Sequence, residues 1–344
     1  MNHSQRFDHY DEDDVRIRPT RRGSRPRSKD RPQHTDAVDG RVIAVDRGRY
    51  HVLVDSDAGD GAAAVTAMKS RNLGRKSIVV GDSVGLVGDV SGTRDTMARI
   101  VRQNPRRSVL RRTADDNDPV ERVIVANADQ LVIVTALANP QPRTRLIDRC
   151  LVAAYDAGLT PILLLTKSDL VSPDELLSMY GDLLVGVLVT RVTEHGTEGL
   201  DEVREALSGK VSVLVGHSGV GKSTLVNALV PDASRATGVV NVVTGRGRHT
   251  SSSAVALPLP NDSGWVVDTP GVRSFGLAHV DLNRVIDHFP ELAVGTAGCP
   301  RSCSHDEPDC GLDEFVAKEA GAQPHLASRL ESLRRLLRSR SSEE

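Results

Sequence analysis

The sequence predicts an α/β chain in which a small β-barrel comes first, a mostly parallel sheet covered by helices follows, and a small helical region with three cysteines comes last. Short strands with alternating polar and apolar residues, separated by Gly and Asp, fill residues 37–113 and are typical of a small barrel. From residue 120, continuous apolar runs alternate with helical patterns, which indicates parallel strands buried on both faces. The 344 residues, 39% of them hydrophobic, are enough for two or three domains with their own cores.

Residues 1–36 differ from the rest of the chain because they show almost no apolar periodicity. Residues 11–14 read DEDD, and residues 16–31 hold eight basic residues against one aspartate. Such a segment has too little apolar surface to bury, so we expect a disordered, charged tail. The net charge of the whole chain is −2, and the total charge therefore indicates no partner.

The barrel region begins with GRVIAVDRGRYHVLVDS, which predicts two strands joined at a DRGR turn, and continues with strands around KSIVVGDSVGLVGDV. All strand pairs are expected to be antiparallel. A small β-sandwich without a binding role is the alternative for this region.

The region from 120 to 280 contains five apolar runs that predict buried strands: RVIVAN, QLVIVTAL, TPILLLT, VSVLV and GWVVD. Residues 143–158 have helical spacing, which places Cys150 on an apolar helix face as a core residue, and residues 199–209 form a second predicted helix. Residues 281–344 are expected to be helical and to end in an amphipathic helix whose apolar side is formed by Leu326, Leu330, Leu333 and Leu337.

A Walker A pattern follows the predicted strand VSVLV and leads into a predicted helix. Its residues are Gly216, His217, Ser218, Gly219, Val220, Gly221, Lys222, Ser223 and Thr224. The glycines let backbone N–H groups surround a phosphate at the start of the helix. Lys222 is expected to reach the β and γ phosphates, and the Ser223 hydroxyl to bind Mg²⁺. The alternative, an ordinary Gly-rich turn, is disfavoured by the strand and helix on either side.

Two further segments complete a nucleotide site. In DTPG, Asp268 is expected to hold Mg²⁺ directly or through water, and the N–H of Gly271 to contact the γ-phosphate. In TKSD, at 166–169, the carboxylate of Asp169 can accept two hydrogen bonds from guanine, whereas adenine offers no matching pair of donors. The aliphatic stem of Lys167 can lie over the base. The candidate base-binding residues are therefore Thr166, Lys167, Ser168 and Asp169, and the predicted ligand is GTP rather than ATP.

A third cluster lies near the end of the chain and consists of Cys299, Cys303, His305 and Cys310. Three thiolates and one imidazole suit tetrahedral Zn²⁺ and leave no open position, which predicts a structural zinc site. Three free cysteines in a reducing compartment are the alternative.

The order of these motifs resembles the ribosome small-subunit-dependent GTPase A family (RsgA, also called YjeQ). Ordinary GTPases carry the phosphate loop before the base-reading motif, whereas here TKSD precedes GHSGVGKST, GRHTSS and DTPG, as in a circularly permuted GTPase. The resemblance covers about residues 37–325. It implies an OB-fold RNA-binding domain at 37–113, a permuted GTPase domain at 120–280 and a zinc-binding domain with a basic helix at 281–344. Thr250 matches the switch threonine that meets Mg²⁺, and the resemblance implies a catalytic role for His249.

Three positions depart from the family pattern. Thr166 stands where the base motif usually has Asn, residues 192–200 lack the usual Ser-Ala pair of the second base loop, and the outer gaps of the Cys/His cluster are each one residue shorter. In addition, Val272 follows DTPG where many GTPases have a water-orienting Gln, so slow intrinsic hydrolysis is expected.

The partners implied by the resemblance are the small ribosomal subunit with its rRNA, and GTP or GDP, for a monomer that acts in late subunit maturation. The barrel contains a single aromatic residue, Tyr50, which favours recognition of RNA shape and phosphates over base stacking. Two arginine groups are candidate RNA contacts: Arg102, Arg106, Arg107, Arg111 and Arg112 at the end of the barrel region, and Arg334, Arg335, Arg338 and Arg340 on the last helix.

No apolar stretch is long enough to span a bilayer and no signal peptide is apparent, so a cytoplasmic protein without membrane contact is expected. Two other functions remain open at this stage: a GTP-gated RNA-binding scaffold with negligible hydrolysis, and an ATP-dependent enzyme that uses the phosphate loop.

Overall fold

The structure is a computed structural model that describes residues 34–54, 63–74, 77–93, 96–113, 120–181, 186–194, 196–231, 254–269, 276–277, 280, 282–323 and 325–341. Residues 36–344 pack together as one unit. Most of the predicted tail and residues 114–119, between the barrel and the α/β region, lie outside the described residues, as do His249, Thr250 and Gly271.

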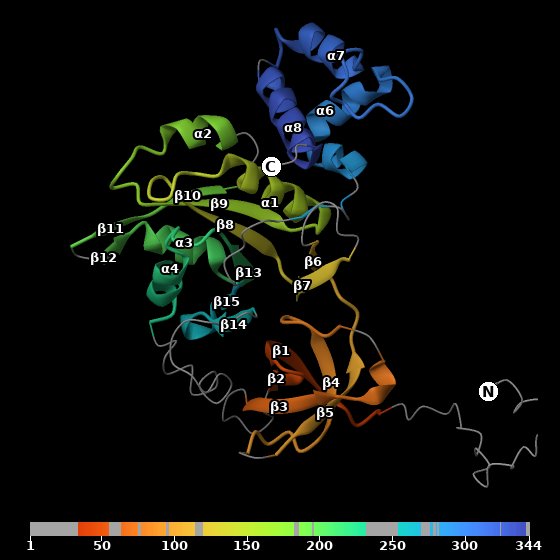
Figure 1. Ribbon diagram of the computed structural model, residues 1–344, viewed down its shortest axis with the longest axis vertical. Helices are drawn as coiled ribbons and strands as arrows, with labels where there is room; N and C mark the ends of the chain where they lie inside the picture. Colours follow the sequence, from red (N-terminus) through yellow and green to blue (C-terminus); the bar gives the residue numbers. More distant parts are fainter. Residues whose placement is uncertain are drawn as a thin grey trace, which may run out of the picture. The chain divides into compact units, whose positions relative to one another are not determined.

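Five strands near the N-terminus form a closed barrel (Figure 1). They are β1 (Val38–Asp46), β2 (Arg49–Val54), β3 (Ala63–Lys69), β4 (Ser83–Gly88) and β5 (Ala98–Gln103). They are ordered β1-β2-β3-β5-β4, and β4 pairs back onto β1. The DRGR turn has φ values of 44° at Arg47 and 83° at Gly48, the two positive values that a tight hairpin loop requires. The expectation of antiparallel pairs throughout was wrong for one pair, because β3 and β5 run parallel.

A second set of strands forms the α/β part of the chain, in the order β10-β9-β8-β13-β15-β14. Their bounds are Gln130–Ala136 (β8), Thr160–Thr166 (β9), Gly186–Val189 (β10), Lys210–Val215 (β13), Val255–Pro258 (β14) and Gly264–Asp268 (β15). The pairs from β10 to β15 are parallel, and β14 is the antiparallel strand at the end. A short 3-10 turn, η4 (Pro260–Asp262), joins β14 to β15.

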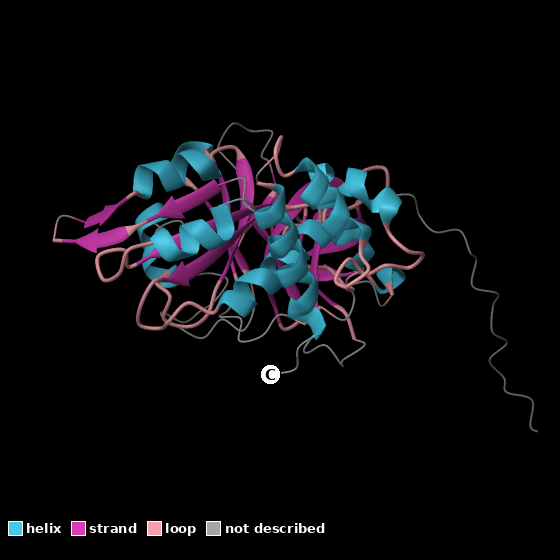
Figure 2. Cartoon of the chain, turned by 90° about the horizontal axis from the view of Figure 1, so that it is seen from above, coloured by secondary structure: helices cyan, strands magenta, loops and turns pink. Residues whose placement is uncertain are grey.

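Helices cover both faces of this sheet (Figure 2). Along β8, Leu131 and Ile133 pack into one core with helix α1 (Thr144–Asp156), and Val132 and Val134 pack into the opposite core. Helix α2 (Asp174–Tyr180) joins the first face, and helices α3 (Leu200–Leu207) and α4 (Lys222–Leu229) join the second. Cys150 is 1% exposed on α1, which confirms its assignment to the core.

One strand predicted for the parallel sheet lies elsewhere. Strand β7 (Arg122–Ala126) pairs antiparallel with β6 (Val109–Arg112) in a separate two-stranded sheet. A further hairpin, β11 (Arg191–Thr193) with β12 (Gly196–Glu198), occupies the place of the expected second base loop.

The C-terminal region is helical, as expected, and consists of η5 (Leu282–His288), α6 (Pro290–Ala293), η6 (Val294–Gly298), α7 (Gly311–Glu319) and α8 (Leu326–Ser341). The four predicted leucines of α8 are buried, and they share one core with α1. No described helix has the length and apolar character needed to cross a membrane.

The barrel and the sheet are joined by backbone pairing. Ala44 of β1 pairs with Val255 of β14, so the two sets of strands form one continuous sheet. In addition, Thr113, which follows β6, pairs with Gly276. Barrel and sheet therefore contact each other through main-chain bonds as well as through side chains.

Candidate nucleotide site and metal site

The phosphate loop lies between β13 and α4, as the Walker A pattern predicts. A Cβ on Gly216 would lie 2.5 Å from the carbonyl oxygen of Val134, so only glycine fits there. Gly221 has φ 92° and immediately precedes α4, a backbone angle that again favours glycine. Ser223 and Thr224, in the first turn of α4, are exposed. The loop therefore presents the start of a helix and two hydroxyls to solvent, as phosphate and Mg²⁺ binding requires.

Lys222 is 9% exposed and connects the phosphate loop to the end of β15. Its ammonium donates to the carboxylate of Asp268 and to the carbonyl of Thr269. The Thr269 hydroxyl in turn donates to the carbonyl of Leu214, on β13, at 2.7 Å. The structure thus brings together Lys222, Ser223 and Asp268, and it adds Thr269, which the sequence did not single out because a threonine after an acidic residue carries no distinctive signal.

The TKSD segment contacts the phosphate loop although it precedes that loop by about fifty residues in the chain. The hydroxyl of Thr166, which is 7% exposed, donates to the carbonyl of Val220 at 2.6 Å. The ammonium of Lys167 donates to the carbonyl of Gly219 at 3.0 Å and also to that of Asn139. A hydroxyl at position 166 can therefore hold the phosphate loop in the absence of the usual asparagine.

The remaining residues of TKSD face a different neighbour. Ser168 donates through its N–H and its hydroxyl to the carbonyl of Thr190, at 3.4 and 3.3 Å. Thr190 is 4% exposed and follows β10, so its contact orders the chain next to Asp169. Asp169 is exposed at the end of the segment, where its carboxylate is open to a ligand.

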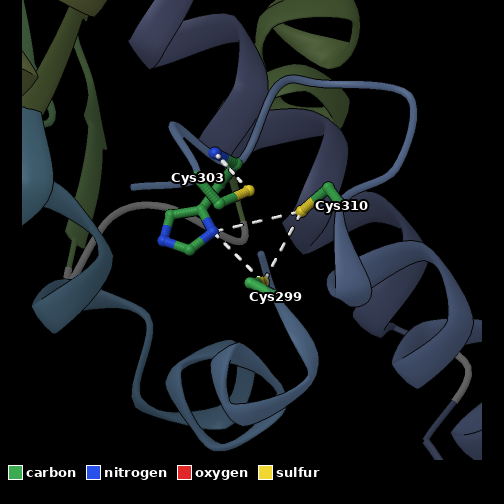
Figure 3. Close-up of side chains that lie close together, drawn as sticks. Cys299, Cys303 and Cys310 are labelled. Atoms are coloured by element: carbon green, nitrogen blue, oxygen red, sulfur yellow. Dashed lines mark hydrogen bonds between the residues drawn. The ribbon is translucent and has the colours of Figure 1, made fainter. Parts of the chain in front are cut away.

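The four predicted metal ligands meet in one cluster, with their ligand atoms all within 4.8 Å of one another. The sulfurs of Cys299 and Cys310 lie 3.9 Å apart, and Nδ1 of His305 lies 3.6 Å from the first and 4.0 Å from the second. A tetrahedron with metal–sulfur bonds of about 2.3 Å has edges of about 3.8 Å. The residues therefore fit a tetrahedral metal ion, and Figure 3 shows Cys299, Cys303 and Cys310 converging on this point.

The protonation of the cluster also suits a metal. Burial lowers the pKa of His305, which keeps the imidazole neutral and able to coordinate. Burial, together with the Glu307 carboxylate and Cys310 nearby, raises the pKa of Cys303 to about 12. A metal ion reverses this effect because it stabilises the thiolate directly, so metal binding would release protons. The Glu307 carboxylate accepts from the Ser304 N–H at 3.0 Å, which lowers its own pKa to about 2.

The arginine groups expected to contact RNA are largely paired with carboxylates of the same chain. In the first group, Arg102, Arg106, Arg107 and Arg111 pair with Asp39, Asp82, Asp129 and Glu121. On α8, Arg334, Arg335 and Arg338 pair with Asp313, Asp148 and Asp306. Arg112 is half-buried, and the side chain of Arg340 lies outside the described residues. Much of this positive charge therefore serves the fold.

Comparisons with known proteins agree on one family. The family model described as RsgA GTPase matches residues 103–278. The chain is 35% identical over 290 residues to the small ribosomal subunit biogenesis GTPase RsgA of Gemmatimonas aurantiaca, covering 83% of this chain and 93% of that protein. It is 40% identical over 281 residues to the protein of the same name from Pseudomonas aeruginosa, covering 79% and 78%.

Solved structures show the same fold. YjeQ from Thermotoga maritima is 26% identical with a TM-score of 0.61, and the match covers 89% of this chain and 99% of that one. YloQ, a circularly permuted GTPase, matches with a TM-score of 0.58 at 21% identity over 88% of this chain and 98% of the other.

Proposed function

Because this chain belongs to the RsgA GTPase family, we propose that it hydrolyses GTP in response to the small ribosomal subunit and acts in the late biogenesis of that subunit. The protein acts as a monomer in the cytoplasm. GTP and GDP are its nucleotides, and the small subunit with its rRNA is its partner.

The observation that carries this proposal is the contact between the base-reading segment and the phosphate loop. Thr166 and Lys167 donate to the carbonyls of Val220 and Gly219, so the two motifs form one site despite their reversed order in the chain. A single site that reads guanine at one end and holds phosphates at the other is what GTP hydrolysis requires.

Individual residues have distinct parts in the proposed site. Asp169 reads guanine, and the N–H groups of 216–224 hold the phosphates together with Lys222. Ser223, Asp268 and Thr250 hold Mg²⁺, which neutralises charge on the phosphates, and the N–H of Gly271 contacts the γ-phosphate. His249 orients the attacking water or stabilises developing charge, because Val272 cannot do so.

The cluster of Cys299, Cys303, His305 and Cys310 holds one structural Zn²⁺. Three thiolates and an imidazole favour zinc among the common divalent ions, and four protein ligands leave no position open for catalysis. The metal would stiffen the loop between η6 and α7, and Arg334 of α8 already contacts that loop by donating to the carbonyl of His305 at 3.1 Å.

Single-turnover GTP hydrolysis with and without purified small subunits tests the proposed activity. We expect slow hydrolysis by the protein alone and strong stimulation by the subunit. His249→Ala should remove most of the stimulated rate with little change in GTP affinity, whereas the matched variant His325→Ala, at an exposed position just before α8, should behave like the parent. Negligible hydrolysis both with and without subunits would favour a GTP-gated scaffold instead, and equal use of ATP would contradict base reading by Asp169.

A further inference from the structure

A pocket lies where the outer surface of the barrel meets the sheet. Its volume is about 280 Å³, close to the lower end of the range of about 300–1,000 Å³ that small-ligand sites occupy. The residues that line it are Asp39, Gly40, Arg41, Leu53, Ser83 and Trp265.

One wall of the pocket is a row of three residues across neighbouring barrel strands. Arg41 of β1 pairs with Leu53 of β2 on one side and with Ser83 of β4 on the other. Their chain neighbours Val42 and Val52 point into the barrel core, so this row lies on the outer surface. Trp265 of β15 forms the facing wall, and the guanidinium of Arg41 lies 5.7 Å from the centre of its ring.

Trp265 supplies what the barrel itself lacks. The aromatic residue of the barrel, Tyr50, is 8% exposed and belongs to the barrel core, so it cannot stack on a base. Trp265 is half-buried beside the barrel and is the chain's single tryptophan. An aromatic ring beside a guanidinium is a stacking surface for other planar rings. The exposed bases of single-stranded nucleic acid can stack on it.

The polar groups around the ring suit a base as well. Arg41 is exposed and, among the described residues, contacts the Trp265 ring rather than a carboxylate, so its charge is available to a phosphate. Asp39 accepts from Arg102 at 2.7 Å and from Asn104 at 3.1 Å, both at Oδ1. These two donors keep the carboxylate ionised, and its other oxygen can accept from the amino group of a base.

We propose that this pocket binds one unstacked base of single-stranded RNA, with the base against Trp265 and the adjoining phosphate near Arg41. The inference rests on the proposed function, since it names a contact through which the protein holds the rRNA of the small subunit. It also gives the barrel a means of base recognition, because a residue of the neighbouring sheet provides the stacking surface.

The single tryptophan makes the test direct, because Trp265 emission reports on this pocket alone. The full-length protein is titrated with a single-stranded oligoadenylate of about six nucleotides, with the same oligomer made abasic, and with duplex RNA. We expect saturable quenching by the oligoadenylate and weak quenching by the other two. Arg41→Ala should weaken the binding of the oligoadenylate about two- to thirtyfold. The control Arg49→Ala removes the same charge from an exposed position on β2 and should change the affinity less than twofold at elevated salt.

Trp265→Leu should weaken RNA binding about five- to a hundredfold, as measured by the anisotropy of labelled RNA, while Trp265→Phe should retain most of the affinity. If Trp265→Leu does not fold, Arg41→Ala with the emission readout still decides the matter. Unchanged emission, or equal quenching by the abasic oligomer, would overturn the inference.

Two further measurements separate the pocket from the proposed function and from the N-terminal tail. If the unaltered protein co-sediments with small subunits while Trp265 emission stays constant, the pocket inference fails and the proposed function stands. If it does not co-sediment at all, the proposed function fails, and the oligoadenylate titration decides the pocket. If deleting residues 1–33 shifts the emission without RNA, the tail occupies the pocket and the RNA proposal is wrong.

Discussion

Replacing Arg335 with alanine should weaken the packing of α8 against α1 and α2. Arg335 donates to the carboxylate of Asp148 at 3.3 Å and to the carbonyl of Met179 at 3.2 Å, and its guanidinium lies 4.6 Å from the centre of the Tyr180 ring. Asp148, on α1, is 4% exposed. The variant would therefore leave a buried carboxylate without its cation.

The size of the effect follows from this burial. Removing one partner of a buried ion pair costs about 3–5 kcal/mol. Because the Arg335 side chain is 26% exposed, water can partly replace it, and we expect a value near the lower end, about 3 kcal/mol. The matched control is Arg338→Ala on the same helix, since its pair with Asp306 is 54% and 28% exposed and should contribute little to stability.

The effect should also depend on pH. Burial raises the pKa of Asp148 above its usual value, and Arg335 opposes that rise. Without Arg335 the folded-state pKa rises further, so the variant is penalised only where the carboxyl is ionised. The stability difference from the parent should be small in acid, should grow as the pH rises through the raised folded-state pKa of Asp148 in the parent, and should level off above the still higher folded-state pKa in the variant.

Urea unfolding of the parent, Arg335→Ala, Asp148→Asn and the double variant measures both points. We expect a coupling free energy of about 1–3 kcal/mol at neutral pH. If Arg335→Ala costs the same in the parent as in the Asp148→Asn background, or the same as Arg338→Ala, the buried pair does not hold α8 on α1.

Other expected outcomes concern the two sites and the tail. Asp169→Asn should weaken GTP binding about ten- to a hundredfold and favour XTP, because two charge-assisted bonds are lost and the amide can donate to xanthine. If Asp169 does not read the base, competition binding would show no change in the affinity for either nucleotide. Thr166→Val should lower the free energy of unfolding or of GTP binding by about 1–3 kcal/mol, because the Val220 carbonyl loses its donor. Thr166→Asn should recover most of that loss. Scanning calorimetry measures the effect on unfolding, and titration calorimetry measures the effect on GTP binding. Cys303→Ser should lower the metal content from about one zinc per chain to near zero and weaken the C-terminal helices, as metal analysis and melting would reveal, and a parent protein without metal would refute the site. Deleting residues 1–36 should weaken subunit binding mainly at low salt, since a basic tail acts through phosphate charge; an equal loss at all salt concentrations would indicate specific contacts.

Features set by neighbours in sequence could be predicted from the sequence. The phosphate loop was found because its glycines fall between an apolar strand and a helix, and the structure has both at that place. The metal cluster was found because its four ligands lie within twelve residues, and they do converge. The buried face of α8 followed from helical spacing alone.

Features set by distant partners could not be predicted in the same way. An apolar run such as RVIVAN indicates a strand but not its partner, and β7 pairs with β6 instead of joining the parallel sheet. Arginines near the end of the barrel suggested RNA, whereas Arg106 is held by Asp82, which is fully buried. Nothing in the sequence pairs Arg335 with Asp148, 187 residues earlier, because charge complementarity over such separations depends on the folded arrangement.

The main-chain pairing between barrel and sheet has a thermodynamic consequence. β14 follows the segment that contains Thr250 and pairs with Ala44 of the barrel. Gly276 follows the segment that contains Gly271 and pairs with Thr113, next to the β6–β7 hairpin, and that hairpin pairs through Val125 with Val80, just before barrel strand β4. If the γ-phosphate alters these two segments, the barrel is displaced or ordered with them, and linkage then requires reciprocity. The factor by which GTP tightens the grip on the subunit must equal the factor by which the subunit tightens GTP. Hydrolysis removes this coupling free energy from the binding of the nucleotide and from the binding of the subunit at the same time. Loss of the γ-phosphate would therefore favour release of the protein from the subunit.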